Sequence, residues 1–299
     1  MVRKIKKFHA MKILILILLN ILIFQISCTK KSDLENKRIL PDYKNTEGVE
    51  LIFTKVPTNF FTDSIYDIEY SLRNKLSTNT TVRIWILKPE FVEIKDDSEF
   101  TVSKPKVEEL EGMSELTPDG GTIDRRIQIG FKEQEFSRNF DIVFNYLYTA
   151  SFSDNFLICI DFNKYGFTTL QGCKYSNPNI LPRGNPLYPK AIEYEINKLN
   201  DEEYRIDFTI SFNYQRDVSY YGVSNCENID MQYLSKIPIN VTFGESTSTK
   251  ILNLIADEKI YVSFFHKEVP KNIYKYLIIN YTYCVEAKKA LNNLMVKKR

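Results

Sequence analysis

Histidine and glycine are scarce in this sequence, and each scarcity excludes a class of site. Only 2 of the 299 residues are histidine. One of them, His9, lies near the N-terminus, so a zinc site built from several histidines is excluded. Glycine occurs 10 times, which argues against the glycine-rich loops that bind phosphate. Neither a G-x-S-x-G nor an H-E-x-x-H motif is present, so His266 is interpreted as a partly exposed residue at a strand end.

The sequence lacks a strong excess of charge of either sign. Its formal net charge is +2, but the charge is unevenly distributed along the chain. The first 27 residues hold five basic residues and no acidic one, so the other 272 residues sum to −3. A mildly acidic body is poorly suited to binding nucleic acid, and we exclude nucleic acid as the main partner.

The N-terminus has the order of a secretory signal. Basic residues precede a run at 13–26 that is apolar except for Asn20 and Gln25. A membrane-spanning helix needs about 20 apolar residues, so this run is short for one. We predict that residues 1–27 are a signal peptide or N-terminal anchor. Residues 28–46 are mostly polar and are predicted to form a flexible tether.

Ser27 and Cys28 follow the apolar run directly. Together with Ile26 they resemble the lipobox of prokaryotic lipoproteins, although Gln25 stands where that family prefers leucine. The resemblance implies that Cys28 is lipidated and becomes the first mature residue. Ordinary cleaved secretion and an uncleaved anchor are the alternatives. Lipidation, cleaved secretion and an uncleaved anchor all place the body of the chain outside the cytoplasmic membrane. With lipidation or an uncleaved anchor, the chain is also attached to the cell membrane or cell surface.

Alternation of apolar and polar residues dominates from Val49 onward and is clearest in 66–73 and 204–212. Such alternation places the apolar side chains on one face of a strand and leaves the other face in water. The best helical candidate is 286–296, near the C-terminus. The sequence therefore predicts an all-β fold of antiparallel sandwiches.

The strand pattern repeats after about 140 residues, with proline-rich sequence between the two copies. Four prolines fall between residues 178 and 189, and proline cannot donate to a strand ladder. We predict two tandem immunoglobulin-like antiparallel β-sandwiches with flanking segments. The expected segments are a first sandwich at 47–173, a proline-rich linker at 174–189, a second sandwich at 190–287 and a basic tail at 288–299.

The first half also carries an ordered set of features: an opening strand at 50–53, Asp63, a long strand at 66–73, Asn74 and a new strand at 82–86. This order resembles the CARDB-type immunoglobulin-like domains of archaeal and bacterial surface proteins. The segment 110–121 is similar to one found in some archaeal tandem-Ig membrane proteins. The resemblance covers roughly residues 45 to 287 and implies no catalytic residues.

Four cysteines remain besides Cys28, and an even count in an exported chain favours disulfides. Pairing within each predicted sandwich gives Cys159–Cys173 and Cys226–Cys284. The alternative is four buried free thiols. No two cysteines are closer than 14 residues, which does not fit the usual ligand spacing of a zinc site. We predict no metal and no cofactor.

Candidate surface sites are few. Tyr214, Tyr220 and Tyr221 cluster with arginine, serine and asparagine, a composition typical of recognition loops. The alternative is that these tyrosines cap the core. Asn79 is the most accessible of three N-x-[ST] triplets and is a candidate for glycosylation. The acidic cluster at 96–99 is interpreted as a solvated turn rather than a calcium site.

These observations predict a membrane-anchored extracytoplasmic interaction or structural protein rather than an enzyme. We expect it to bind a protein or glycan through the loops or edges of its sandwiches. One alternative is an exported enzyme or solute-binding lipoprotein, for example one that hydrolyses glycans with two carboxylates. Another is a subunit of a surface filament or secretion assembly, which would use an exposed strand edge.

The anchor can be tested by fractionating cells that carry Cys28→Ala. Because a lipid can be attached only through the thiol, we expect the variant to move from the membrane to the soluble fraction. Retention in the membrane with an intact leader would contradict lipidation and support a spanning N-terminal helix.

Overall fold

The computed structural model describes residues 44–95, 100–133, 136–162, 178–200, 202–227, 229–267 and 273–298. The regular structure in these ranges is β-strand apart from one short 3-10 turn, and they contain no helix long and apolar enough to cross a membrane. The predicted all-β, antiparallel sandwich fold is therefore confirmed. The leader, Cys28 and all but the last residues of the predicted tether lie outside the described residues.

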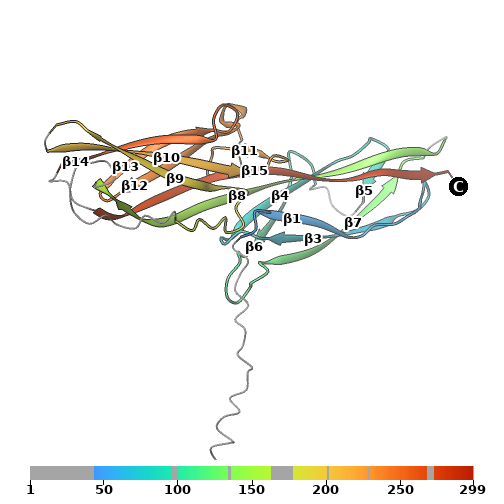
Figure 1. Ribbon diagram of the computed structural model, residues 1–299. Helices are drawn as coiled ribbons and strands as arrows, with labels where there is room; N and C mark the ends of the chain where they lie inside the picture. Colours follow the sequence, from blue (N-terminus) through green and yellow to red (C-terminus); the bar gives the residue numbers. More distant parts are fainter. Residues whose placement is uncertain are drawn as a thin grey trace, which may run out of the picture. The chain divides into compact units, whose positions relative to one another are not determined.

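Three sheets make up the fold (Figure 1). The first has the order β1–β3–β7–β5, comprising Val49–Lys55, Tyr66–Asn74, Thr122–Phe131 and Val92–Ile94. The second has the order β14–β10–β9, comprising Lys259–Lys267, Glu203–Tyr214 and Leu187–Lys198. The third is eight-stranded and follows the path β13–β12–β15–β8–β4–β6, comprising Ser246–Asn253, Lys236–Phe243, Ile273–Lys297, Arg138–Ile160, Thr80–Leu87 and Lys106–Leu110. Two short strands, β2 (Phe60–Phe61) and β11 (Ser219–Tyr221), pair with β15.

Strands β8 and β15 form one long antiparallel ribbon that belongs to both halves of the fold. Their register runs from Ile160 opposite Ile273 to Arg138 opposite Val296. At about 3.3 Å per residue, the 23 residues of β8 extend for about 75 Å. Nearly all even-numbered residues of β8 are buried, from Phe140 to Ile160, and they belong to one continuous hydrophobic core. A single apolar face of the ribbon therefore serves both halves.

Each of the smaller sheets covers a different part of this ribbon and its neighbours. Phe53 in β1 packs edge-on against Phe144 in β8, with ring centroids 5.1 Å apart. In the other half, Phe208 in β10 lies 5.1 Å from Phe243 in β12, and Phe212 lies 5.9 Å from Tyr281 in β15. These contacts between facing sheets are the packing expected of β-sandwiches.

The segment at 286–296 is a strand, so the expected helix is wrong. It is the final part of β15, it pairs with β8, and its last residues pair in parallel with β2. The ladder has an irregularity between Leu291 and Leu294, where Asn293 has a φ of 58°. Beyond this irregularity the buried positions change from odd to even numbers, which disguised the strand period. Most of the predicted basic tail at 288–299 is consequently part of the ribbon.

The proline-rich linker is hydrogen-bonded to the first half of the fold. Gly184 accepts a hydrogen bond from the Gly48 N–H (2.8 Å) and donates one to the Asn45 carbonyl (2.9 Å). The Arg183 carbonyl accepts a bond from the Ser77 N–H at 3.1 Å. Residues 187–189, which we assigned to the linker, begin β9, an edge strand that tolerates Pro189.

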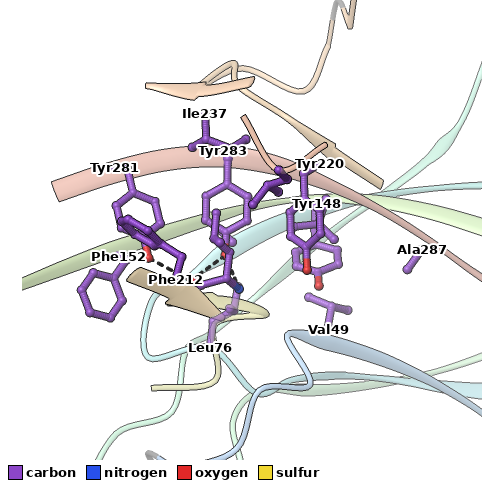
Figure 2. Close-up of a cluster of buried hydrophobic side chains, with 14 of the residues drawn as sticks. Val49, Leu76, Tyr148, Phe152, Phe212, Tyr220, Ile237, Tyr281, Tyr283 and Ala287 are labelled. Atoms are coloured by element: carbon purple, nitrogen blue, oxygen red, sulfur yellow. Dashed lines mark hydrogen bonds between the residues drawn. The ribbon is translucent and has the colours of Figure 1, made fainter. Parts of the chain in front are cut away.

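Buried tyrosines of the ribbon, among them Tyr148, Tyr281 and Tyr283, lie in the core near the start of β9 (Figure 2). The Tyr281 hydroxyl donates to the Leu187 carbonyl at 2.9 Å, and the Leu187 N–H donates to the Tyr283 hydroxyl at 3.2 Å. Burial raises the pKa of both phenols well above the ordinary value, so they stay protonated. The ribbon therefore holds the start of β9 through hydrogen bonds that are buried from water.

Gly184→Ala tests whether the linker conformation is required by the fold. Gly184 has a φ of 78°, and an added Cβ would lie 1.6 Å from the Lys75 carbonyl oxygen. We expect the free energy of unfolding, measured by chemical denaturation, to fall by at least about 2 kcal/mol. Gly130→Ala is the matched control, because its Cβ would meet only the flexible side chain of Lys95. Equal losses in both variants would contradict a special role for the linker.

Candidate functional site

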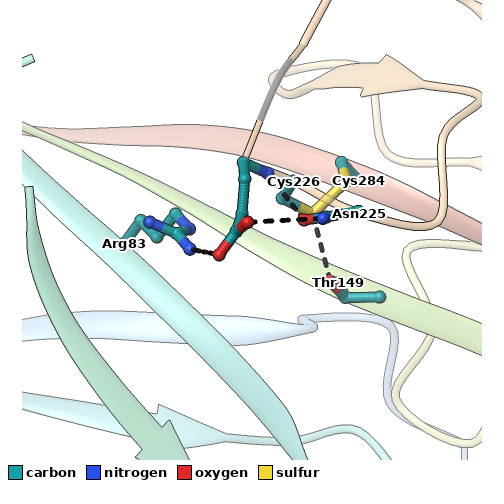
Figure 3. Close-up of polar contacts among 6 residues, drawn as sticks. Arg83, Thr149, Asn225, Cys226 and Cys284 are labelled. Carbon is teal, nitrogen blue, oxygen red and sulfur yellow. Dashed lines mark hydrogen bonds and ion pairs between the residues drawn. A yellow bond between two sulfur atoms is a disulfide. The ribbon is translucent and has the colours of Figure 1, made fainter. Parts of the chain in front are cut away.

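A disulfide fixes the segment between β11 and β12 on the outer face of the eight-stranded sheet. Cys226 in this segment is bonded to Cys284 in β15, which confirms that predicted pair (Figure 3). Cys284 is buried although it lies on the side of β15 opposite the main core. Leu147 and Tyr221 complete a small separate cluster around it. The segment is therefore held on the sheet by covalent and apolar contacts.

The second predicted pair is described only at one end. Cys159 is disulfide-bonded, whereas Cys173 lies outside the described residues. The acidic cluster at 96–99 also lies outside them.

A cleft of about 310 Å³ opens beside the tied segment. Its floor is a row of three residues from adjacent strands, Arg83 in β4, Leu147 in β8 and Glu286 in β15. Trp85 lies two residues beyond Arg83 and lines the same cleft. The tied segment contributes Glu227 and Ile229 from above the sheet. Because paired strands carry the floor, the positions of these side chains are set by the sheet register.

Arg83 connects the floor of the cleft to the tied segment. Its guanidinium forms an ion pair with the Glu227 carboxylate (Figure 3). The Glu227 N–H donates to the Asn225 side-chain oxygen at 2.9 Å, which fixes the turn that presents the carboxylate. The positive charge of Arg83 is thus matched within the cleft.

Glu286 is oriented by a tyrosine. The Tyr221 hydroxyl donates to Glu286 Oε2 at 2.7 Å. Burial of Tyr221 and its bond to Glu286 raise the pKa of the phenol to about 12, so it remains a donor at neutral pH. Among the described residues, no Lys, Arg or His side chain forms an ion pair with Glu286. The cleft therefore holds one carboxylate that is fixed in place and not neutralised.

The predicted tyrosine recognition surface is not exposed, and that prediction is wrong. Tyr220 and Tyr221 are only 3% and 5% exposed, and Tyr214 is half-buried against Tyr220. The Tyr220 hydroxyl donates to the carbonyls of Pro186 (3.1 Å) and Gln215 (2.9 Å). Tyr220 and Tyr221 lie in a strand, so one packs into the main core and the other into the cluster around the disulfide. Only Tyr221 reaches the cleft, where it holds Glu286.

Asn79 is exposed in the turn between β3 and β4, and its side-chain oxygen accepts a bond from the Gly112 N–H at 2.9 Å. Its glycosylation stays a prediction. The other two triplets begin at Asn240 and Asn280, which lie opposite each other in β12 and β15. Both line a second groove of about 650 Å³, which residues 222–225 of the tied segment also line.

No metal site is found in the described ranges, which hold no cluster of three or more His, Cys, Asp and Glu side chains in suitable positions. His266 is half-buried, with its ring centroid 6.1 Å from that of Phe162.

The sequence analysis missed the residues that line the cleft. They come from strands and loops separated by up to about two hundred residues, and none of them belongs to a local motif. The one available signal was the Cys226–Cys284 pair. Glu227 directly follows Cys226, and Glu286 lies two residues after Cys284, so this disulfide brings the two carboxylates to the same region.

Comparisons with known proteins do not identify the chain. No protein-family model matches the sequence, and no curated protein does. The chain shows a likeness to the crystal structure of the YadV chaperone with a TM-score of 0.21 and 10% sequence identity, covering 81% of this chain and 99% of that chain. A likeness at this TM-score carries no argument about fold or function.

Proposed function

We propose that this chain is a membrane-anchored extracytoplasmic interaction protein that captures a partner polypeptide at the cleft beside the tied segment. The basic and apolar leader and the lipobox-like Ile26-Ser27-Cys28 support export and anchoring through the N-terminus. The Cys226–Cys284 disulfide supports an oxidising compartment. In this proposal the immunoglobulin-like sandwiches, similar in strand order to CARDB-type domains, hold the cleft away from the membrane.

The observation that carries the proposal is a mixed aromatic and charged cleft on a rigid sheet. Tryptophan and arginine are prominent in the energetics of protein interfaces, and Trp85 and Arg83 both line this cleft, where Tyr221 holds Glu286. Its volume of about 310 Å³ suits one or two side chains of a partner. Sheet pairing and the disulfide fix these groups before binding, which lowers the entropy lost on association.

Glycan hydrolysis is the second candidate, because Glu227 and Glu286 line one cleft. Glycosidases use two carboxyl groups, one of which must be protonated to act as the acid. Here the Glu227 carboxylate accepts from Arg83 and the Glu286 carboxylate accepts from Tyr221, so both groups act as hydrogen-bond acceptors within the chain. This arrangement fits binding better than acid catalysis. Turnover of a polysaccharide that is lost in both Glu227→Gln and Glu286→Gln would establish the enzyme instead.

Assembly through the β13 edge receives less support from the structure. Strand β13 is a terminal strand of the eight-stranded sheet, and its Lys250 is exposed opposite the buried Ile239. A lysine on the inner face of an edge strand opposes the addition of a further strand. We therefore place partner capture at the cleft rather than at this edge.

Trp85→Ala tests the site of capture in pull-downs from surface extracts with the full chain. Removing a central aromatic anchor costs about 2 kcal/mol or more, so we expect recovery of specific partners to fall by at least about tenfold. Tyr276→Ala is the matched control, because Tyr276 is a 58% exposed aromatic residue of β15 that does not line the cleft. Equal recovery of every partner by Trp85→Ala and wild type would rule out the cleft.

A further inference from the structure

We propose that the cleft recognises a basic side chain, arginine or lysine, of the partner polypeptide. This inference rests on the proposed function, because it names the chemistry of the partner at the same cleft. Three observations support it: the net negative charge of the cleft, its apolar and aromatic lining, and the poor fit of acidic or apolar side chains next to Glu286.

The charge balance of the cleft favours a cation. Arg83 and Glu227 neutralise each other, so the pair adds no net charge. Glu286 then leaves one negative charge, and its position is fixed by the 2.7 Å bond from Tyr221. Lys288 lies two residues further along the same face of β15, but it is exposed to solvent and does not line the cleft. Water and salt screen an exposed charge of this kind more strongly than a charge within the cleft.

The apolar and aromatic lining of the cleft suits the methylene stem of a basic side chain. Leu147 and Ile229 offer apolar surface to the methylene stem of lysine or arginine. Trp85 is half-buried and offers its ring, and tryptophan is the aromatic residue that attracts cations most strongly. An arginine can also stack its planar guanidinium on the indole. A basic side chain therefore satisfies the carboxylate, the aromatic ring and the apolar surface together.

Other side chains fit the cleft less well. An acidic group would face the uncompensated carboxylate of Glu286, and like charges repel. A neutral apolar group would remove water from Glu286 and give it no partner, which is unfavourable for a buried charge. Glu286 therefore disfavours both acidic and neutral apolar side chains in the cleft.

The single tryptophan of the chain is the reporter for this inference. Trp85 lines the cleft, and no other tryptophan contributes to the signal. The full chain is titrated with three capped tripeptides that carry arginine, lysine or norleucine between two glycines, and tryptophan fluorescence is recorded. Norleucine has the apolar stem of lysine without its charge. We expect a saturable change with the arginine and lysine peptides and none with norleucine over the same concentrations.

Glu286→Gln supplies the decisive variant. The amide keeps the size of the side chain and an oxygen that accepts from Tyr221, but it removes the charge. We expect the affinity for both basic peptides to fall at least about tenfold. Glu193→Gln, an exposed carboxylate of β9 outside the cleft, is the matched control and is expected to bind like wild type.

Three results would overturn the inference: no saturable change with either basic peptide, equal binding of the norleucine peptide, or undiminished binding by Glu286→Gln. These failures are distinguishable from failure of the proposed function. If Trp85→Ala loses partner capture while Glu286→Gln retains it, the cleft is the site but a basic side chain is not its ligand. If Trp85→Ala retains partner capture, the proposed site itself is wrong.

Discussion

The pairing of β8 with β15 is the interaction on which the rest of this structure depends. The two strands remain in register from one half of the fold to the other, and one apolar face runs along them throughout. A conventional tandem arrangement joins two complete sandwiches through a linker that few contacts cross. Here both halves use β8 and β15 as part of their sheets. The linker is also hydrogen-bonded, at Leu187 by Tyr281 and Tyr283 and at Gly184 by Gly48 and Asn45. The two sheets that cover the ribbon therefore share a single core.

The same ribbon explains where the candidate site lies. Its inner face is committed to the core, so only its outer face can display residues to a partner. On that face the Cys226–Cys284 disulfide fastens a loop segment to β15, and the cleft forms where this segment approaches β4. Consecutive residues of β8 show that the ribbon serves both the core and the cleft. Tyr146 and Tyr148 face the main core, whereas Leu147 between them faces outward and forms part of the floor of the cleft. Rigidity of the fold and geometry of the site thus come from the same strands.

The fold class was readable from sequence because alternation is a local property. The runs at 66–73 and 204–212 are β3 and β10 as expected, and Cys226–Cys284 is bonded. The final part of β15 was misread because the irregularity at 291–294 changes the parity of its buried residues. Tyr220 and Tyr221 were misplaced because composition cannot distinguish a tyrosine in an exposed loop from one in a short strand against the core. The cleft was missed because it depends on register between strands far apart in sequence, which no local pattern encodes.

The most direct test of this account is differential scanning calorimetry of the full chain with its disulfides intact. Because the ribbon gives both halves one core, we predict a single unfolding transition. Its calorimetric enthalpy should equal the van't Hoff enthalpy obtained from the shape of the same transition. Two separate transitions, or a calorimetric enthalpy about twice the van't Hoff value, would show that the halves unfold independently and would contradict the central role of the ribbon.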